Sequence, residues 1–385
     1  MRRLAVAPRA NFEARARELG FAFHTIDGEA YWNESACYAF TLRQIEDDLE
    51  APSAELHQMA MELVGRAARD EALLTRLRIP RQAWPLVADS FARGDASLYG
   101  RFDLSYDGKS PAKLLEYNAD TPTSLYESAV FQWVWLEDAM KQGLIPQGAD
   151  QFNSLHEKLV ARLGEIASGG LFHIAGLRDN EEDKGFVAYL EDCARQAGIE
   201  TSVIGMSDIG VSAENKFCDP KDRWIELMFK LYPWEWMMAD EFGASPAMAN
   251  TTFIEPAWKM ILSNKGALAL LWQMAPGHPN LLETYFEDDP RKSALGGRFA
   301  RKPLLSREGA NVMLVDGEHV AREEGPYGAE GFVRQALAPL PDFDGWRPVV
   351  GSWIVGDEAA GIGLREDRDP ITSNTSRFTP HAILD

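Results

Sequence analysis

Residues 100–124 read GRFDLSYDGKSPAKLLEYNADTPTS. Two strand-like runs flank an Asp-Gly dipeptide, which is typical of a β-hairpin. Side chains two residues apart share one face of a strand, so Arg101 and Asp103 point the same way, as do Glu116 and Asn118. If the two strands pair with these faces together, the facing side chains lie about 5 Å apart. The stretch therefore predicts a hairpin that carries a cluster of oxygen ligands.

Two carboxylates and an amide oxygen suit Mg²⁺, which prefers oxygen ligands and keeps room for water and phosphate. Arg101 beside them is suited to clamp an anion. The register is open, because a tight turn pairs Asp103 with Ala112, and only a wider loop brings Glu116 level with Asp103. An ordinary solvated hairpin with salt bridges is the alternative.

Two lysines are further candidates for contacts with phosphate. Lys265 lies in LSNKGALALLW, and Lys302 precedes a small Gly-containing loop, SREGAN, between two expected strands. Such a loop can offer cations and backbone N–H groups to polyphosphate. The Walker pattern GxxxxGK[ST] is absent from the sequence, and exposed lysines beside turns are the alternative.

Acidic and aromatic residues mark a third candidate region. Glu181, Glu182 and Asp183 follow the expected strand LFHIAG, where ligands bind in open α/β sheets. Acidic residues there suit an amine, although they also suit the first turn of a helix. Tyr232 and Trp234, which flank Pro233 beside Glu235, are candidate pocket residues in a Trp-rich and Met-rich stretch that we otherwise expect in the core.

The chain divides into three expected regions. Residues 1–95 read mainly as helices, residues 96–220 as an α/β region, and residues 221–385 as a region that becomes antiparallel strands and Gly-rich turns from 296 onward. Ser124 and Glu127 form a capping-box pattern before an expected helix over 124–141. The polar C-terminal run around Arg365 is either part of a site or a mobile tail.

The net charge, the cysteine content and the distribution of apolar residues exclude several classes of function. The net charge of -20 argues against nucleic acid or an anionic membrane as a partner. Three cysteines without a CxxC pair indicate a reducing compartment. There is no apolar run long enough for export or for a membrane span. We therefore expect a soluble, cytoplasmic protein that acts on small molecules.

Seven motifs together resemble the glutathionylspermidine synthase family, in particular its stand-alone synthetases. They are GRFDLSYDG, LLEYNADTPTS, KLYPWEW, EPAWKMILSNKGALALLWQ, ARKPLLSREGAN, VGSWIVGDEAAGIGLRED and ITSNTSRFTPH. The resemblance implies an ATP-grasp-like fold of mixed α+β and α/β character. An N-terminal helical region, a small α/β region and a C-terminal antiparallel grasp region would make up this fold.

The resemblance also implies roles for residues. The candidates for Mg²⁺ ligands are Asp103, Glu116 and Asn118, and the candidate catalytic arginines are Arg101 and Arg365. The candidate ATP contacts are Lys265, Lys302, Arg307, Glu308, Gly309 and the stretch Arg334, Gln335, Ala336, Leu337. The candidate substrate contacts are Glu181 and Glu182, with Thr121 and Tyr232 added.

The implied activity is an ATP- and Mg²⁺-dependent ligation of a glutathione-like carboxylate to a polyamine-like amine through an acyl-phosphate. The alternatives are a ligase for a different peptide and amine, and a nucleotide-binding ATPase that acts through a partner protein. Bifunctional members of the family add an N-terminal amidase with a nucleophilic cysteine. No amidase activity is expected here, because residues 1–95 read as helical.

Overall fold

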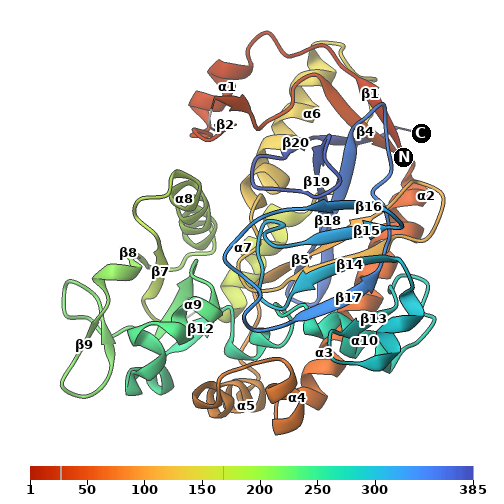
Figure 1. Ribbon diagram of the computed structural model, residues 1–385. Coiled ribbons are helices and arrows are strands. Elements are labelled where there is room, and N and C mark those ends of the chain that lie inside the picture. The colour runs from red at the N-terminus through yellow and green to blue at the C-terminus, as the bar shows by residue number, and fades with distance from the viewer. Residues whose placement is uncertain (27, 168, 385) are drawn as a thin grey trace.

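The computed structural model describes residues 1–26, 28–167 and 169–384. Its centre is an antiparallel sheet in the order β20-β19-β18-β5-β6 (Figure 1). Its strands are β5 (Tyr99–Ser105), β6 (Lys113–Asn118), β18 (Arg347–Val355), β19 (Glu358–Asp367) and β20 (Arg377–Thr379). Helix α3 (Ala51–Ala67) packs on this sheet, with Ser53 Oγ 2.7 Å from Ser352 Oγ. The central sheet therefore draws strands from both halves of the chain.

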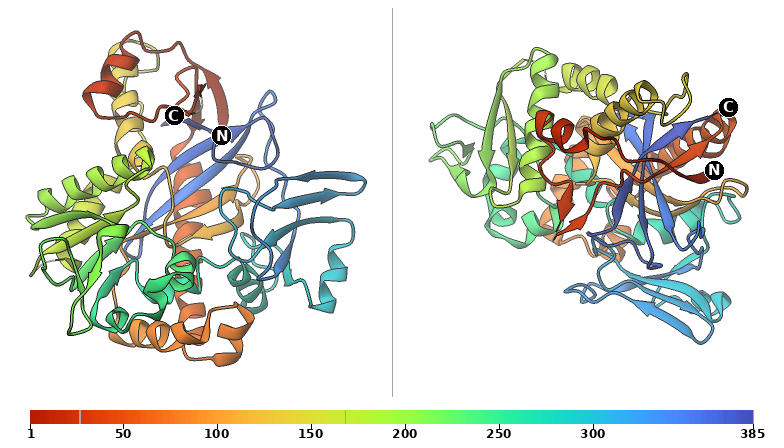
Figure 2. Two further views of the ribbon diagram at one scale, coloured as in Figure 1. Left: turned by 60° about the vertical axis from the view of Figure 1, so that its left-hand side comes forward. Right: turned by 90° about the horizontal axis from the view of Figure 1, so that it is seen from above.

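A second antiparallel sheet forms a separate layer, in the order β13-β17-β14-β15-β16 (Figure 2). Its strands are β13 (Thr284–Phe286), β14 (Arg298–Pro303), β15 (Met313–Asp316), β16 (His319–Arg322) and β17 (Phe332–Ala336). The antiparallel strands that we expect from residue 296 onward are confirmed. The expectation missed β13, which comes before that residue.

The third large sheet is parallel, in the order β12-β11-β7-β8. Its strands are β7 (Phe172–Gly176), β8 (Thr201–Gly205), β11 (Leu227–Lys230) and β12 (Thr252–Ile254), and helices α7 (Leu155–Ile166) and α8 (Glu181–Gln196) accompany it. The alternation of helices and strands over residues 151–205 predicts the β7–α8–β8 unit, which the pairing confirms. The boundary expected near residue 220 falls inside this sheet, because β11 and β12 follow that residue.

Both ends of the chain meet in one small sheet, in the order β1-β4-β21 (Figure 1). Its strands are β1 (Arg2–Ala5), β4 (Ala36–Phe40) and β21 (His381–Ile383). The expectation of a mainly helical region over 1–95 is therefore only partly right for its first forty residues, which contain the helix Phe12–Glu18 but also four strands, of which β4 is fully buried. A buried strand needs a partner on each side, and here one partner comes from the opposite end of the chain.

The helices expected from residue 42 onward are present. They are α2 (Leu42–Ile45), η1 (Glu46–Glu50), α3, α4 (Glu71–Arg76), η2 (Arg81–Ala83) and α5 (Trp84–Arg93). The single helix expected over residues 53–77 is divided into α3 and α4. Asp70 caps α4 by accepting hydrogen bonds from the backbone N–H groups of Ala72 and Leu73, which starts a new helix there.

Shorter elements connect and cover the sheets. They are α1 (Phe12–Glu18), β2 (Thr25–Ile26), β3 (Glu29–Ala30), η3 (Glu127–Phe131), α6 (Gln132–Lys141), η4 (Met206–Asp208), β9 (Gly210–Val211), β10 (Phe217–Cys218), α9 (Trp234–Ala239), η5 (Glu241–Ala244), η6 (Pro246–Asn250), η7 (Ala257–Met260), α10 (Gly266–Met274) and η8 (Pro290–Leu295). Among the described residues, no helix is long and apolar enough to cross a membrane.

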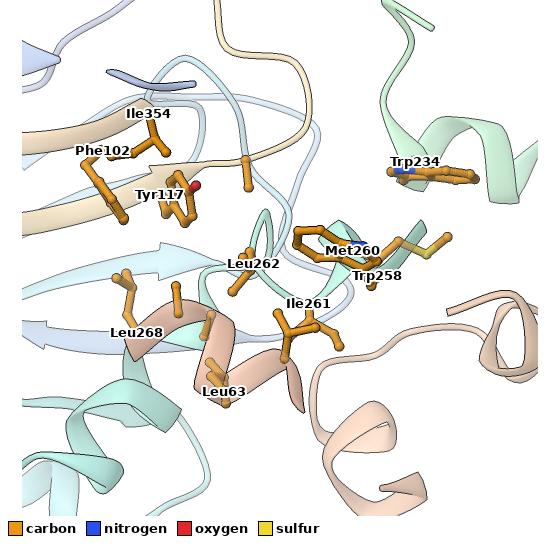
Figure 3. Close-up of a cluster of buried hydrophobic side chains, with 14 of the residues drawn as sticks. Leu63, Phe102, Tyr117, Trp234, Trp258, Met260, Ile261, Leu262, Leu268 and Ile354 are labelled. Carbon is orange, nitrogen blue, oxygen red and sulfur yellow. The ribbon is translucent and has the colours of Figure 1, made fainter. Parts of the chain in front are cut away.

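The Trp-rich and Met-rich stretches supply much of the core (Figure 3). Trp234, Trp258 and Met260 are buried, as their sequence context predicts, and they belong to the same cluster as Phe102 of β5. Trp224 and Trp236 are exceptions, because they remain 48% and 40% exposed. Burying such large side chains contributes about 1.5–3 kcal/mol each, so this cluster holds the central sheet against the surrounding helices.

A buried carboxylate joins the small terminal sheet to the central sheet. Glu366 of β19 is 0% exposed and accepts hydrogen bonds from Arg3 Nε at 2.7 Å and Arg3 Nη2 at 2.8 Å. Tyr38 Oη and Asn33 Nδ2 donate to the same carboxylate at 2.6 Å and 2.8 Å. Every donor comes from the first forty residues, so this one group anchors the N-terminal segment.

We expect Glu366→Ala to lower the free energy of unfolding by about 3 kcal/mol, because it leaves the partly buried Arg3 guanidinium without its anion. Urea unfolding followed by circular dichroism measures the change. Glu358→Ala is the matched control on the same strand, since Glu358 forms an exposed pair with Lys158 that contributes little. Equal losses in the two variants would contradict the anchoring role.

Candidate active site

The β5–β6 hairpin has the register that a shared site requires. Asp103 pairs with Glu116 and Arg101 pairs with Asn118, and a bulge follows Asp103. The connection between the strands is a wide loop. In this loop Asp107 accepts hydrogen bonds from the backbone N–H groups of the residues two and three positions later, at 2.8 and 2.7 Å. The wide-loop register that the sequence left open is therefore the one that forms, and the tight turn is not.

Opposite charges surround the two facing carboxylates. Arg101 makes a two-pronged ion pair with Asp103, with Nε at 2.7 Å and Nη2 at 3.0 Å from its oxygens. Asn118 Nδ2 donates to Asp103 at 2.8 Å and to Glu116 at 3.2 Å. Lys265 Nζ lies 3.0 Å from Glu116 Oε2. The four hairpin side chains and one lysine thus form a single network.

The two lysines reach this network from different elements. Lys265 is the residue before α10, and its Nζ also donates to the carbonyl of Ser306 at 2.5 Å. Lys302 of β14 donates to Gln335 Oε1 and to the Leu115 carbonyl, each at 2.8 Å. Burial lowers the pKa of Lys302 to about 8. Burial alone would raise the pKa of Glu116, but Lys265 and Lys302 outweigh it and lower that pKa to about 2.

A cavity of about 400 Å³ opens between the second antiparallel sheet and the central sheet. Gln335, Ala336 and Leu337 line it, together with apolar side chains such as Leu314 and Ile371. Arg334 turns to the other face of its strand, where it pairs with Glu287 at 2.7 Å. Three of the four residues expected to contact adenine thus lie on an apolar wall that suits a flat ring, and the contact with adenine stays a prediction.

A second cavity, of about 80 Å³, adjoins the first. Asp103, Glu116, Gly309 and Thr372 line both cavities. The other lining residues that matter here are Arg101, Asn118, Thr121, Arg307, Glu308 and Arg365. The carboxylates of the hairpin therefore lie at the junction, where an elongated ligand in the large cavity meets one in the small cavity.

The loop between β14 and β15 closes over this junction. Glu308 and Gly309 both have left-handed backbones, with φ of 51° and 74°. A Cβ atom on Gly309 would lie 2.6 Å from the carbonyl oxygen of Thr372, so only glycine allows this approach. The loop and the segment that carries Thr372 thus meet across the cavities.

Arg365 organises the C-terminal turn. It donates to the backbone carbonyls of Ser373 at 2.6 Å, Asn374 at 2.8 Å and Ser376 at 3.1 Å. The turn leads into β20, which pairs with β19. The C-terminal run is therefore ordered structure beside the small cavity, and the alternative of a mobile tail is wrong.

Two glutamates, Glu127 and Glu182, interact electrostatically with Arg365 of the small cavity, although neither lines that cavity. Glu182, in the first turn of α8, has its pKa raised to about 7 by burial and by Glu127. Glu127 is buried, which raises its pKa, and it accepts a hydrogen bond from Tyr31 Oη at 2.6 Å. Glu127 does not close the expected capping box with Ser124, whose φ is 67° and whose hydroxyl lies 2.9 Å from the same Tyr31 Oη.

Of the four predicted substrate residues, Thr121 alone lines one of these two cavities. Glu181 is exposed and pairs with Lys184 at 2.6 Å, and Tyr232 donates to Asp240 at 3.0 Å. The sequence reasoning missed Glu127 and Tyr31. A lone glutamate in the apolar run LYESAVFQW was the available signal for Glu127, because a carboxylate is seldom buried without a partner. The local sequence gives no such signal for Tyr31.

The residues at the junction fit a metal-bound polyphosphate. Two carboxylates and an amide face one space, which is the oxygen donor set that Mg²⁺ takes while it keeps water and phosphate ligands. No cluster of three or more His, Cys, Asp and Glu ligands occurs in residues 1–26, 28–167 and 169–384. Thr372 lines both cavities, and its Oγ1 is buried without a hydrogen-bond partner, so a phosphate oxygen would satisfy it.

The family model described as glutathionylspermidine synthase preATP-grasp matches residues 3–384. A Haemophilus influenzae protein whose name proposes acid–amine ligase activity is 42% identical over 383 residues, covering 95% of each chain. The Crithidia fasciculata trypanothione synthetase is 29% identical over 85% of this chain. The Escherichia coli bifunctional glutathionylspermidine synthetase/amidase is 26% identical over 91% of this chain. This chain spans only 54% and 60% of those last two proteins.

A solved structure supports the fold alone. The glutathione synthetase-like effector from Globodera pallida superposes with a TM-score of 0.57 at 10% identity, over 96% of both chains. The mixed α/β architecture with several sheets is therefore shared with a glutathione synthetase-like protein.

We expect Asp103→Asn and Glu116→Gln each to weaken Mn²⁺ binding at least tenfold, because each removes a charged oxygen ligand without changing shape. Electron paramagnetic resonance of Mn²⁺, used as a Mg²⁺ substitute, measures the affinity. Asp288→Asn is the control, since Asp288 is exposed, pairs with Arg76 and lines neither cavity. Unchanged binding in both hairpin variants would exclude these residues as ligands.

Proposed function

Because the chain belongs to the glutathionylspermidine synthase family, whose members are acid–amine ligases, we propose that it joins a carboxylate to an amine in a reaction that consumes ATP and requires Mg²⁺. The observation that supports this most is the junction of the two cavities. Asp103 and Glu116 line both cavities, between Lys302 of the large cavity and the arginines of the small one, and Lys265 Nζ lies 3.0 Å from Glu116. A phosphoryl group that moves from one cavity to the other must pass these residues.

A carboxylate needs activation before an amine can displace its oxygen. ATP supplies a phosphoryl group that turns the oxygen into a leaving group, and Mg²⁺ neutralises charge during the transfer. Asp103, Glu116 and Asn118 would hold the metal. Lys265 and Lys302 would hold the phosphates, and their pairing with Glu116 and Gln335 keeps both ammonium groups aimed at the junction.

The small cavity would hold the reacting carboxylate. Arg101 is fixed by Asp103 and by the Thr123 carbonyl at 2.5 Å, so its guanidinium is oriented before the ligand arrives. Arg101 and Arg365 both line this cavity and would stabilise the oxyanion that forms when the amine attacks. No covalent bond to the protein is required.

Glu182 and Glu127 would receive the amine. A carboxylate with a pKa near neutrality can hold an ammonium group and accept its proton, which the amine must lose before it attacks. The relatives are named as synthetases of glutathionylspermidine and trypanothione. We therefore propose a glutathione-like peptide as the carboxylate and a polyamine-like molecule as the amine.

Incubation with ATP, Mg²⁺, thiol peptides and polyamines should give a product whose mass equals peptide plus amine minus water. Asp103→Ala should reduce its formation at least a hundredfold, because the metal site is lost. Mass spectrometry detects the product, and Asp288→Ala, which lies outside both cavities, is the control. ATP turnover that no peptide or amine stimulates would instead favour an ATPase that acts through a protein partner.

The KM for the amine should fall as the pH rises from 6 to 8. Glu182 is neutral below its pKa of about 7 and charged above it, so it attracts an ammonium group only at the higher pH. Glu182→Gln should have a high KM that changes little over this range. Steady-state kinetics measure both proteins, and an equally steep profile in the variant would assign the titration to another group.

A further inference from the structure

The loop over the cavities is tied to the opposite wall by one arginine. Arg307 Nη2 donates to the Thr121 carbonyl at 3.2 Å and to the Thr121 hydroxyl. Its Nη1 lies 3.4 Å from Glu235 Oε1, and its guanidinium lies 6.0 Å from the centre of the Trp236 ring. These contacts join the β14–β15 loop to the turn after β6 and to helix α9, which are far from it in the sequence.

The wall that receives Arg307 is itself rigid. Asp120, next to Thr121, is 2% exposed, and its Oδ1 lies 2.7 Å from Lys230 Nζ at the end of β11. Its Oδ2 accepts the backbone N–H of Trp234 at 2.8 Å, at the start of α9. Asp120 therefore fixes both of the segments that carry the partners of Arg307, so the loop has an immobile surface to close against.

The ion pair between Glu235 and Arg307 favours the closed loop. Burial raises the pKa of the Glu235 carboxylate, and Arg307 is the cation that opposes this effect most. A charge that is largely desolvated is costly without its partner, so the closed loop is favoured as long as Glu235 is ionised and Arg307 is in place. The same loop meets Thr372 through Gly309 on its other side. Closure thus spans the mouth of the small cavity.

We propose that Glu235 and Thr121 are positioning residues that latch Arg307 and hold the β14–β15 loop shut over the reacting centre. The consequence for catalysis rests on the proposed ligase function. Water that enters an open site attacks the acyl carbon of the acyl-phosphate, phosphate leaves, and the original carboxylate returns. One ATP is then spent and no amide forms, so the latch protects the yield of amide per ATP.

The first test reads loop opening directly and needs no substrate. Trypsin cleaves after Arg307 only when the loop is open, and mass spectrometry measures the new terminus at Glu308. Glu235→Gln removes a charge-assisted contact, so the protein should be cleaved about tenfold faster than the native chain. Glu241→Gln, an exposed change just after α9, is the matched control. Equal cleavage rates in the two variants would overturn the latch.

Thr121→Val provides a second variant, which keeps the backbone acceptor and removes the hydroxyl contact. We expect a smaller increase in cleavage, about threefold. If circular dichroism shows that Glu235→Gln does not fold, Thr121→Val alone tests the latch. A cleavage rate of Thr121→Val equal to that of the Glu241→Gln control would then overturn the proposal.

The second test measures the ratio of ADP to amide formed. The ratio should be near 1 in the native enzyme and rise about threefold to tenfold in Glu235→Gln, whereas a merely structural lesion would lower both products together. A ratio that stays near 1 while trypsin cleavage is faster would overturn the protective role of the latch. If the native enzyme makes no amide, the ligase function fails, and the cleavage result still decides whether the latch exists.

Discussion

Two carboxylates that face each other across a hairpin are the constraint on which this structure depends. Asp103 and Glu116 are direct cross-strand partners, and like charges in that position repel. Arg101 and Asn118 share the hairpin with them, and Lys265 comes from the start of α10. The fold therefore has to bring cations from distant segments to the hairpin, and that requirement explains why the second sheet and α10 meet the central sheet at this point.

Each of the three large sheets contributes different residues to the candidate site. The second antiparallel sheet provides Lys302 and the apolar wall of the large cavity, and the central sheet provides the hairpin and Arg365. The parallel sheet provides Glu182 at the start of α8 and, through Lys230, the buried ion pair with Asp120. The proposed reacting centre thus lies where the three sheets converge, which suits a reaction that brings a nucleotide, a carboxylate and an amine together.

The sequence predicted the features that depend on local pattern. Alternation gave the two faces of the hairpin, and the succession of helix and strand gave the β7–α8–β8 unit. The missed features depend on contacts between distant residues. Glu366 meets Arg3 from the opposite end of the chain, and Arg307 meets Thr121 and Glu235. Periodicity carries no information about such pairs, because each partner is unremarkable in its own segment.

The most direct test of activation through an acyl-phosphate follows an oxygen atom of the reacting carboxylate. A peptide accepted by the enzyme is labelled with ¹⁸O in its reacting carboxylate, and the ligation is run with ATP and amine in unlabelled water. If the carboxylate is activated as an acyl-phosphate at the junction of the cavities, one ¹⁸O atom appears in inorganic phosphate for each amide formed. Label in AMP, or phosphate without label, would contradict the account.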